Sequence, residues 1–159
     1  MSATTHLSEG NVADREIVLT RLLDAPRELV FKVWTDPKHI EQWWGPHGFT
    51  ATVHEMAVKP GGTWRFLMRS AEHGDFPNKV VYREVVAPER LVFDHGADGD
   101  DEAGTFLVTV TFEEEDGKTR LTQRMVFKTA AERDETVAFG AIELGYQTLD
   151  RLGAHLATL

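Results

Sequence analysis

The fold class can be predicted most directly from one stretch of the sequence, residues 105–132: TFLVTVTFEEEDGKTRLTQRMVFKTAAE. Asp116-Gly117 favours a tight turn between two runs of strand-forming residues, Thr105 to Glu113 and Lys118 to Phe127. Side chains alternate between the two faces of a strand, so the first run places one apolar set together: Phe106, Val108, Val110 and Phe112. The stretch therefore predicts an antiparallel hairpin with one face toward a core.

The same stretch ends in Thr129-Ala130-Ala131-Glu132, the pattern of a helix-capping box. Beyond it, apolar or small residues recur at helical spacing: Ala138, Ile142, Gly145, Leu149, Leu152 and Leu156. We expect one long helix of roughly 28 residues and about 42 Å. Each glycine inside such a helix costs about 1 kcal/mol relative to Ala. Gly140, Gly145 and Gly153 therefore indicate a close approach or an unfilled space beside it.

Upstream of residue 105 the pattern predicts a strand, two short helices and more strands. Arg15 to Leu23 forms the first strand, and Asp36 with Pro37 starts the second helix as N-cap and first residue. Further strands are expected over residues 50–56, 63–69, 79–86 and 90–94. Short connections favour antiparallel pairing. The expected fold class is α+β, a seven-stranded antiparallel sheet with a long C-terminal helix.

The chain has 159 residues, which suits one domain over residues 15–159 after a polar leader, residues 1–14. It has no Cys, so disulfides and thiolate metal sites are excluded. With 17 basic against 26 acidic residues, the net charge of −9 argues against a nucleic-acid partner. No apolar run approaches the roughly 20 residues that a bilayer requires, so we expect no membrane insertion and a cytoplasmic location.

Nine of the acidic residues lie between Asp94 and Asp116, where there is no basic residue. They fall into clusters on either side of the strand at residues 105–113, about 30 Å apart at strand rise. This separation exceeds the Debye length of about 8 Å. We interpret the clusters as two solvated turns, not as one site for a cation or a basic partner.

Several short motifs resemble one known family. They are Asp24-Ala25-Pro26, Val30-Phe31, Trp34-Thr35-Asp36-Pro37, Trp43-Trp44-Gly45-Pro46, Gly48-Phe49, Pro60-Gly61-Gly62, Pro88-Glu89-Arg90-Leu91 and Gln147-Thr148-Leu149-Asp150-Arg151-Leu152. Over about residues 15–158 the chain resembles the activator of 90-kDa heat-shock protein ATPase homologue family, of the START/Bet v 1-like (SRPBCC) superfamily. The resemblance implies a helix-grip fold with a cavity between the sheet and the long helix. The chain departs from the family's pattern at Gly145-Tyr146, where the family often has Gly-Trp, and at Lys79-Val80-Val81, where it has a Gly before the strand.

The implied cavity makes the four Trp and nine Phe candidates for its lining. The expected ligand-binding residues are Trp44, His47, Trp64, Phe66, Tyr82, Glu84, Met125, Ile142 and Tyr146. Packing in the core or a lid is the alternative for each Trp. Adjacent side chains on a short helix point in different directions, so one of Trp43 and Trp44 should lie near the mouth.

Two candidate polar residues have alternative interpretations. Glu84 shares a strand face with Tyr82; it either points into the cavity or pairs on the surface with an arginine such as Arg83 or Arg65. His47 borders the expected entrance, as an acid or base or as an ordinary loop residue. No two of the seven His stand at i, i+2 or i, i+4, so we expect no metal site, and no cofactor is expected.

Three hypotheses for function follow. The first is a non-catalytic protein that binds a small hydrophobic or aromatic molecule. The second is an enzyme of cyclase, hydratase or hydrolase type that uses Glu84 or His47. The third, which the resemblance implies, is a chaperone-associated partner protein. A homodimer is expected from base rates alone.

Overall fold

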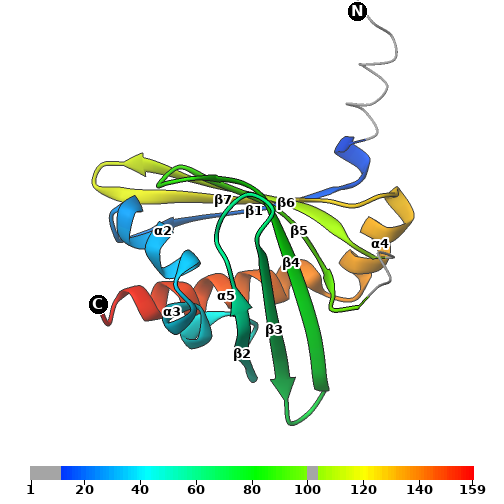
Figure 1. Cartoon of the computed structure of the whole chain (residues 1–159). Coiled ribbons are helices and arrows are strands. Elements are labelled where there is room, and N and C mark those ends of the chain that lie inside the picture. Colours follow the sequence, from blue (N-terminus) through cyan, green and yellow to red (C-terminus); the bar gives the residue numbers. More distant parts are fainter. Residues whose placement is uncertain (1–11, 100–103) are drawn as a thin grey trace, which may run out of the picture.

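The computed structural model describes residues 12–99 and 104–159 (Figure 1). The elements in chain order are β1 (Glu16–Leu23), α2 (Arg27–Thr35), α3 (Pro37–Trp43), β2 (Phe49–Met56), β3 (Thr63–Ser70), β4 (Gly74–Val86), β5 (Arg90–Ala97), β6 (Phe106–Glu115), β7 (Lys118–Val126), α4 (Ala130–Ala138) and α5 (Ala141–Leu156). The expected seven strands and the two short helices after β1 are confirmed. The expected leader lies almost entirely outside the described residues, as does most of the acidic cluster Asp98–Glu102.

The strands form one antiparallel sheet in the order β1-β7-β6-β5-β4-β3-β2. Each neighbour from β2 to β7 is also the next strand in the chain, while β1 pairs with the last strand, β7. Figure 1 shows the sheet curving over α5, with α2 and α3 toward one end of that helix and α4 at the other. This is the helix-grip arrangement, as expected.

The predicted two faces of residues 106–112 are confirmed in β6. Val108, Val110 and Phe112 are buried on the concave face, whereas Leu107 and Thr109 on the convex face are half-buried. Strand alternation thus places the apolar set against the helices and leaves the other set toward solvent.

Two helix starts follow the predicted capping chemistry. The backbone N–H of Lys38 donates to Oδ1 of Asp36 (2.9 Å), and Pro37 opens α3. The backbone N–H of Glu132 donates to Oγ1 of Thr129 (3.1 Å) at the start of α4. Each cap satisfies an amide that has no partner within its own helix.

The expected single long helix is wrong, because the segment is two helices, α4 and α5. Gly140 separates them with a left-handed φ of 99°. At this position glycine ends α4, since it adopts the left-handed region without the steric cost of a Cβ. The chain therefore turns after Phe139, whose side chain is 81% exposed.

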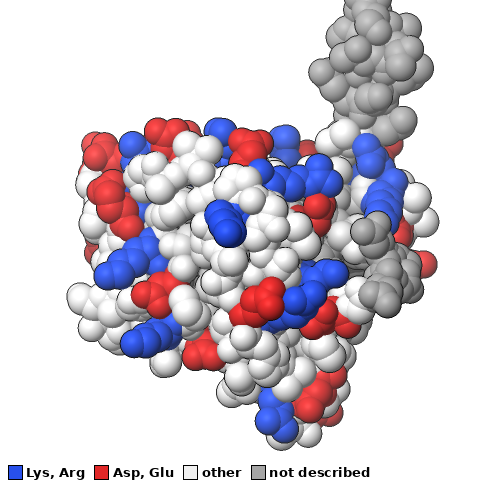
Figure 2. Space-filling view, in the orientation of Figure 1, with Lys and Arg blue, Asp and Glu red and all other residues white. Residues whose placement is uncertain are grey.

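Several outward-facing charges on the sheet form ion pairs. Examples are Arg65 with Glu55 (3.1 Å), Arg120 with Glu115 (3.1 Å) and Arg124 with Glu16 (3.1 Å). Figure 2 shows acidic and basic side chains interspersed over the face in view. In the described residues, no helix is both long enough and apolar enough to span a bilayer.

Candidate ligand site on the concave face

Near α2 and α3, the concave face of the sheet is filled by aromatic side chains. We call this region the closed half; its residues are Trp34, Trp43, Trp44, Trp64, Phe66 and Tyr82, each at most 7% exposed. Ring centroids are 4.9 Å apart for Trp34 and Trp43, and 4.9 Å for Trp44 and Trp64. The prediction that one of the adjacent tryptophans lies near a mouth is wrong, since both are buried. Four of the predicted site residues are therefore core in this structure.

The closed half is apolar almost throughout. The indole N–H of Trp43 donates to the carbonyl of Val33 (3.1 Å), whereas Nε1 of Trp34 and of Trp64 have no hydrogen-bond partner. Trp44 packs edge-to-face against both, at interplanar angles of 83° and 73°. In edge-to-face packing, an indole N–H can point at the neighbouring ring. Burial also raises the pKa of Tyr82, so its phenol stays neutral.

The C-terminal part of α5 is fastened to this half by Arg151. Its guanidinium donates to the carbonyl of Gly45 (2.8 Å), in the loop after α3, and to that of Phe49 (3.0 Å), at the start of β2. The preceding residue, Asp150, pairs with Arg21 of β1 at 2.6 Å. Because hydrogen bonds from a charged donor are stronger than neutral ones, these contacts hold helix, loop and edge strand together.

Two contacts with β1 show how α5 is aligned along that strand. A Cβ at Gly145 would overlap Leu19, and a Cβ at Gly153 would lie 4.0 Å from Leu23. Eight helical residues rise about 12 Å and four strand residues about 13 Å, so helix and strand run alongside each other in step. Extending this register one turn before Gly145 brings Ile142 to about the level of Ile17, which pairs with Met125 of β7. The predicted close approach at a helix glycine is confirmed at Gly145.

The remaining part of the concave face is not fully covered. We call it the open half; its residues are His95, Phe106, Gln123 and Met125 of the sheet and Ile142 of α5. All four sheet residues lie on the inward face but are only half-buried. Ile142, on the stripe of α5 that faces the sheet, is still 38% exposed. An inward-facing apolar surface thus remains accessible beside α5.

The open half is continuous across three strands. His95 pairs with Phe106, and their ring centroids are 5.1 Å apart. Phe106 stacks on Phe127 at 5.0 Å, next to Met125. The Gln123 amide lies 3.8 Å from the Met125 sulfur. This surface offers rings, a thioether and few polar groups, which suits an apolar or aromatic molecule.

His95 is, with Gln123, one of two polar residues of this surface, and the site prediction missed it. Its ring contacts Trp44 (6.3 Å between centroids), Phe66 (5.9 Å) and Phe106, and Nε2 lies 3.1 Å from Oδ1 of Asn78. Burial lowers the pKa of His95 to about 4. Alternation from Phe93 signals an inward side chain, but its neighbours come from other strands and from α3.

Glu84 lies outside this site. A β-bulge between Tyr82 and Glu84 adds one residue to β4, so Tyr82 pairs with the inward Phe93 while Glu84 pairs with the outward Val92. The Glu84 side chain is exposed and pairs with Arg90 at 3.0 Å. The interpretation as an inward acid is wrong; surface pairing with an arginine is confirmed, although the partner differs from those expected.

His47 and Tyr146 also lie away from the open half. His47 is exposed, and its backbone N–H donates to Gln147 of α5 (3.2 Å). The hydroxyl of Tyr146 accepts from the backbone N–H of Thr20 (3.4 Å), and the Arg21 guanidinium lies 5.5 Å from its ring. Tyr146 thus covers the edge of β1. Of the nine predicted residues, Met125 and Ile142 belong to the open half.

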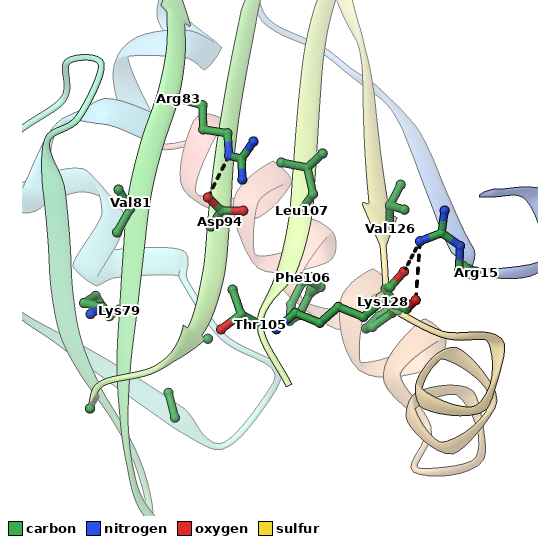
Figure 3. A pocket seen from close by; sticks show the side chains of 14 residues that line it. Arg15, Lys79, Val81, Arg83, Asp94, Thr105, Phe106, Leu107, Val126 and Lys128 are labelled. Atoms are coloured by element: carbon green, nitrogen blue, oxygen red, sulfur yellow. Dashed lines mark hydrogen bonds and ion pairs between the residues drawn. The ribbon is translucent and has the colours of Figure 1, made fainter. Parts of the chain in front are cut away.

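A hollow of about 470 Å³ lies on the convex face, not between α5 and the sheet (Figure 3). Val81, Leu107 and Val126 form an apolar floor, and Arg83 pairs with Asp94 at 2.7 Å beside it. It also reaches Phe106 at the start of β6. This hollow therefore lies on the face opposite α5, whereas the concave face beside the helix carries the partly uncovered surface of the open half.

Metal-ligating side chains do not converge within residues 12–99 and 104–159, where no group of three or more His, Asp or Glu could hold an ion. The nearest approach is a pair, His39 of α3 and His155 of α5, whose ring nitrogens lie 2.9 Å apart. Burial, with a smaller contribution from His39, lowers the pKa of His155. This contact joins the two helices at the closed half.

The sheet that grips α5, with its partly uncovered concave face, defines the class: a helix-grip domain of START/Bet v 1-like architecture. Comparison with sequence families is more specific. The profile of the family described as Activator of Hsp90 ATPase homolog 1-like protein matches residues 24–157, and the chain belongs to this family.

Solved structures agree on the fold. A protein from Arthrobacter aurescens is 24% identical with a TM-score of 0.85, over 93% of this chain and 89% of that one. One from Mycobacterium smegmatis is 24% identical with a TM-score of 0.84, over 92% and 94%. An AHSA1 protein from Silicibacter pomeroyi is 21% identical with a TM-score of 0.73, over 90% and 98%. These similarities establish the architecture and leave the ligand to the site itself.

A curated relative matches part of the chain. The ubiquitin-like modifier-activating enzyme atg7 of Neurospora crassa is 32% identical over 105 residues, which are 64% of this chain but 13% of that protein. The match is one domain-sized piece of a much longer protein, so that protein's activity is not carried over to this chain.

Proposed function

We propose that this protein binds a small hydrophobic or aromatic molecule on the open half, without catalysing a reaction. The observation that supports it is Ile142, which lies on the sheet-facing stripe of α5 and is nevertheless 38% exposed above half-buried apolar residues. Burying such surface is favourable by about 25 cal/mol per Å². A bound ligand would complete the covering that α5 leaves unfinished.

The chemistry of the site supports binding more than catalysis. The two residues considered as acid or base, Glu84 and His47, are both exposed. His95 does face the open half, but a base with a pKa of about 4 is too weak for efficient proton abstraction near pH 7.

The test is a thermal-shift titration with 2-naphthol as the probe. A concentration ten times Kd adds about 1.4 kcal/mol to stability. For a chain of this length we therefore expect the melting temperature to rise by about 3–6 °C. A melting temperature that stays constant up to the solubility limit of 2-naphthol and of a panel of similar bicyclic compounds would contradict the proposal.

Two variants locate the binding surface. Met125→Trp adds a bulky ring to the open half and should abolish the shift. Val18→Trp makes a matched change on the convex face of β1, where Val18 is 46% exposed, and should keep it. Loss of the shift in both variants, or in neither, would place binding elsewhere.

Family membership favours a second candidate, a chaperone-associated role. We propose it for a heat-shock protein ATPase as partner, by relationship alone. The measurement is the ATPase rate of a 90-kDa heat-shock protein with and without a molar excess of this chain. An unchanged rate would count against this candidate and leave the ligand proposal as it stands.

A further inference from the structure

His95 carries an unusual combination of features for a residue on a binding surface. Its ring is enclosed by Trp44, Phe66 and Phe106, and Nε2 contacts Asn78. No charged side chain is among these neighbours. The remaining question is which ring nitrogen carries the proton, because that decides what His95 offers to a ligand.

The Asn78 amide determines the tautomer. Its Nδ2 donates to the carbonyl of Phe76 (2.8 Å), so Oδ1 is directed at His95. The reverse orientation would place the amide oxygen against a carbonyl oxygen, two acceptors with no proton between them. An amide oxygen only accepts, so Nε2 of His95 carries the proton. Because burial lowers the pKa to about 4, the ring is neutral at pH 7 and Nδ1 has a free lone pair.

This lone pair has no partner within residues 12–99 and 104–159. It is also not sealed: the buried side-chain atoms without a hydrogen bond in this part of the chain are Oε2 of Glu16 and Nε1 of Trp34 and Trp64. Nδ1 of His95 is not among them, so this atom keeps some accessible surface. An acceptor that a ligand would cover must be given a donor, or the complex loses the hydrogen bond that water supplied.

A charged group on the ligand would have no charged partner at His95. The side chains that contact its ring, Trp44, Phe66, Phe106 and Asn78, are all uncharged. An anion or a cation placed against this ring would thus meet no opposite charge among them. Either would lose hydration without compensation.

We propose that Nδ1 of His95 accepts a hydrogen bond from the ligand, which selects neutral apolar molecules carrying one O–H or N–H group. This inference rests on the proposed binding at the open half. The aromatic rings and Met125 contact the apolar body, and His95 recognises the donor. The residue acts in specificity and takes no part in any reaction.

The experiment compares 2-naphthol with its methyl ether, 2-methoxynaphthalene, by calorimetric titration. The two share the ring system, and the ether has no O–H. We expect 2-naphthol to bind roughly three- to tenfold more tightly, the range for one neutral hydrogen bond. In His95→Phe the two affinities should become equal, with that of the ether retained. The control His54→Phe, at an exposed position of β2, should keep the preference.

Each outcome has a distinct meaning. Equal binding of both compounds to the unmodified protein overturns the role of His95 and leaves the proposed function intact. Absence of binding by either compound overturns both. If His95→Phe does not fold, the ¹⁵N chemical shift of His95 Nδ1 in the unmodified protein decides: 2-naphthol should move it and the ether should not. A shift with both compounds, or with neither, also overturns the inference.

Discussion

The closed and open halves belong to the concave face of one sheet, yet they are built on different strands, β3 and β4 in the first and β5, β6 and β7 in the second, and they differ in what covers them. In the closed half, α2 and α3 supply Trp34 and Trp43, and every aromatic side chain is buried. In the open half, α5 lies along the edge strand β1 and leaves Met125 and Phe106 half-covered. Side-chain burial therefore decreases from one end of the concave face to the other.

This difference separates two roles within one small domain. Close-packed aromatic rings contribute stability through burial and dispersion. A half-covered apolar surface contributes less to folding and is available to a partner molecule. The helix contacts follow the same division, since Arg151 and Asp150 anchor the C-terminal part of α5, while Ile142 near its start has an exposed side chain.

The largest expected effect is the loss of stability on truncating a side chain in the closed half, compared with the open half. Trp43→Ala should lower the free energy of unfolding by about 3–5 kcal/mol, because the ring is fully buried and its N–H is bonded. Ile142→Ala should cost about 1 kcal/mol, since its side chain is already partly in water. Urea denaturation followed by circular dichroism measures both. Similar losses would show that the halves do not differ in packing.

The next largest effect is the pH dependence of stability that arises from His95 in the open half. An ordinary His has a pKa of about 6.5, and burial lowers that of His95 to about 4. The unfolded chain therefore takes up the proton first as the pH falls. Stability that His95 contributes is complete above pH 6.5 and is lost toward pH 4, by about 3 kcal/mol.

The comparison of unmodified protein with His95→Phe isolates this contribution, because all other titrating groups are shared. Urea denaturation at pH 7 and at pH 4 should show a loss about 3 kcal/mol smaller in the variant. Parallel losses in the two proteins would mean that His95 is readily protonated in the fold, and that its lone pair is not held in an apolar environment.

The smallest expected effect concerns how closely α5 lies on β1. Gly153→Ala places a Cβ at an ordinary 4.0 Å from Leu23 and should stabilise the helix by up to about 1 kcal/mol. Gly145→Ala directs a Cβ into Leu19, which is 1% exposed, so a net loss of about 1 kcal/mol is expected. Thermal unfolding of the two variants compares them. Stabilisation by both would mean that the helix does not approach β1 closely at Gly145.

Local patterns predicted most of the secondary structure. The alternation in residues 106–112, the cap at Asp36 and the cap at Thr129 depend on residues within one or two turns, and the structure confirms all three. The end of α4 at Gly140 could not be predicted in this way, because a glycine in an apolar stripe is compatible with both a helix interior and a helix end. Tertiary contacts decided between them.

The site depends on features that the alternation of apolar and polar residues along the strands does not reveal. The bulge beside Arg83 reverses the face of Glu84, and nothing in the alternating pattern marks it. His95 sits among side chains from β3, β4, β6 and the end of α3, so its neighbours and its pKa follow only once these segments are assembled.

The family, the order of elements and the apolar face of each strand can be predicted from the sequence, because they follow from local spacing and residue type. Which aromatic residues are buried, which face Glu84 takes, and how far α5 covers Met125 and His95 depend on the assembled fold. The burial of a side chain depends on surfaces that come together from distant parts of the chain, so local sequence patterns do not predict it.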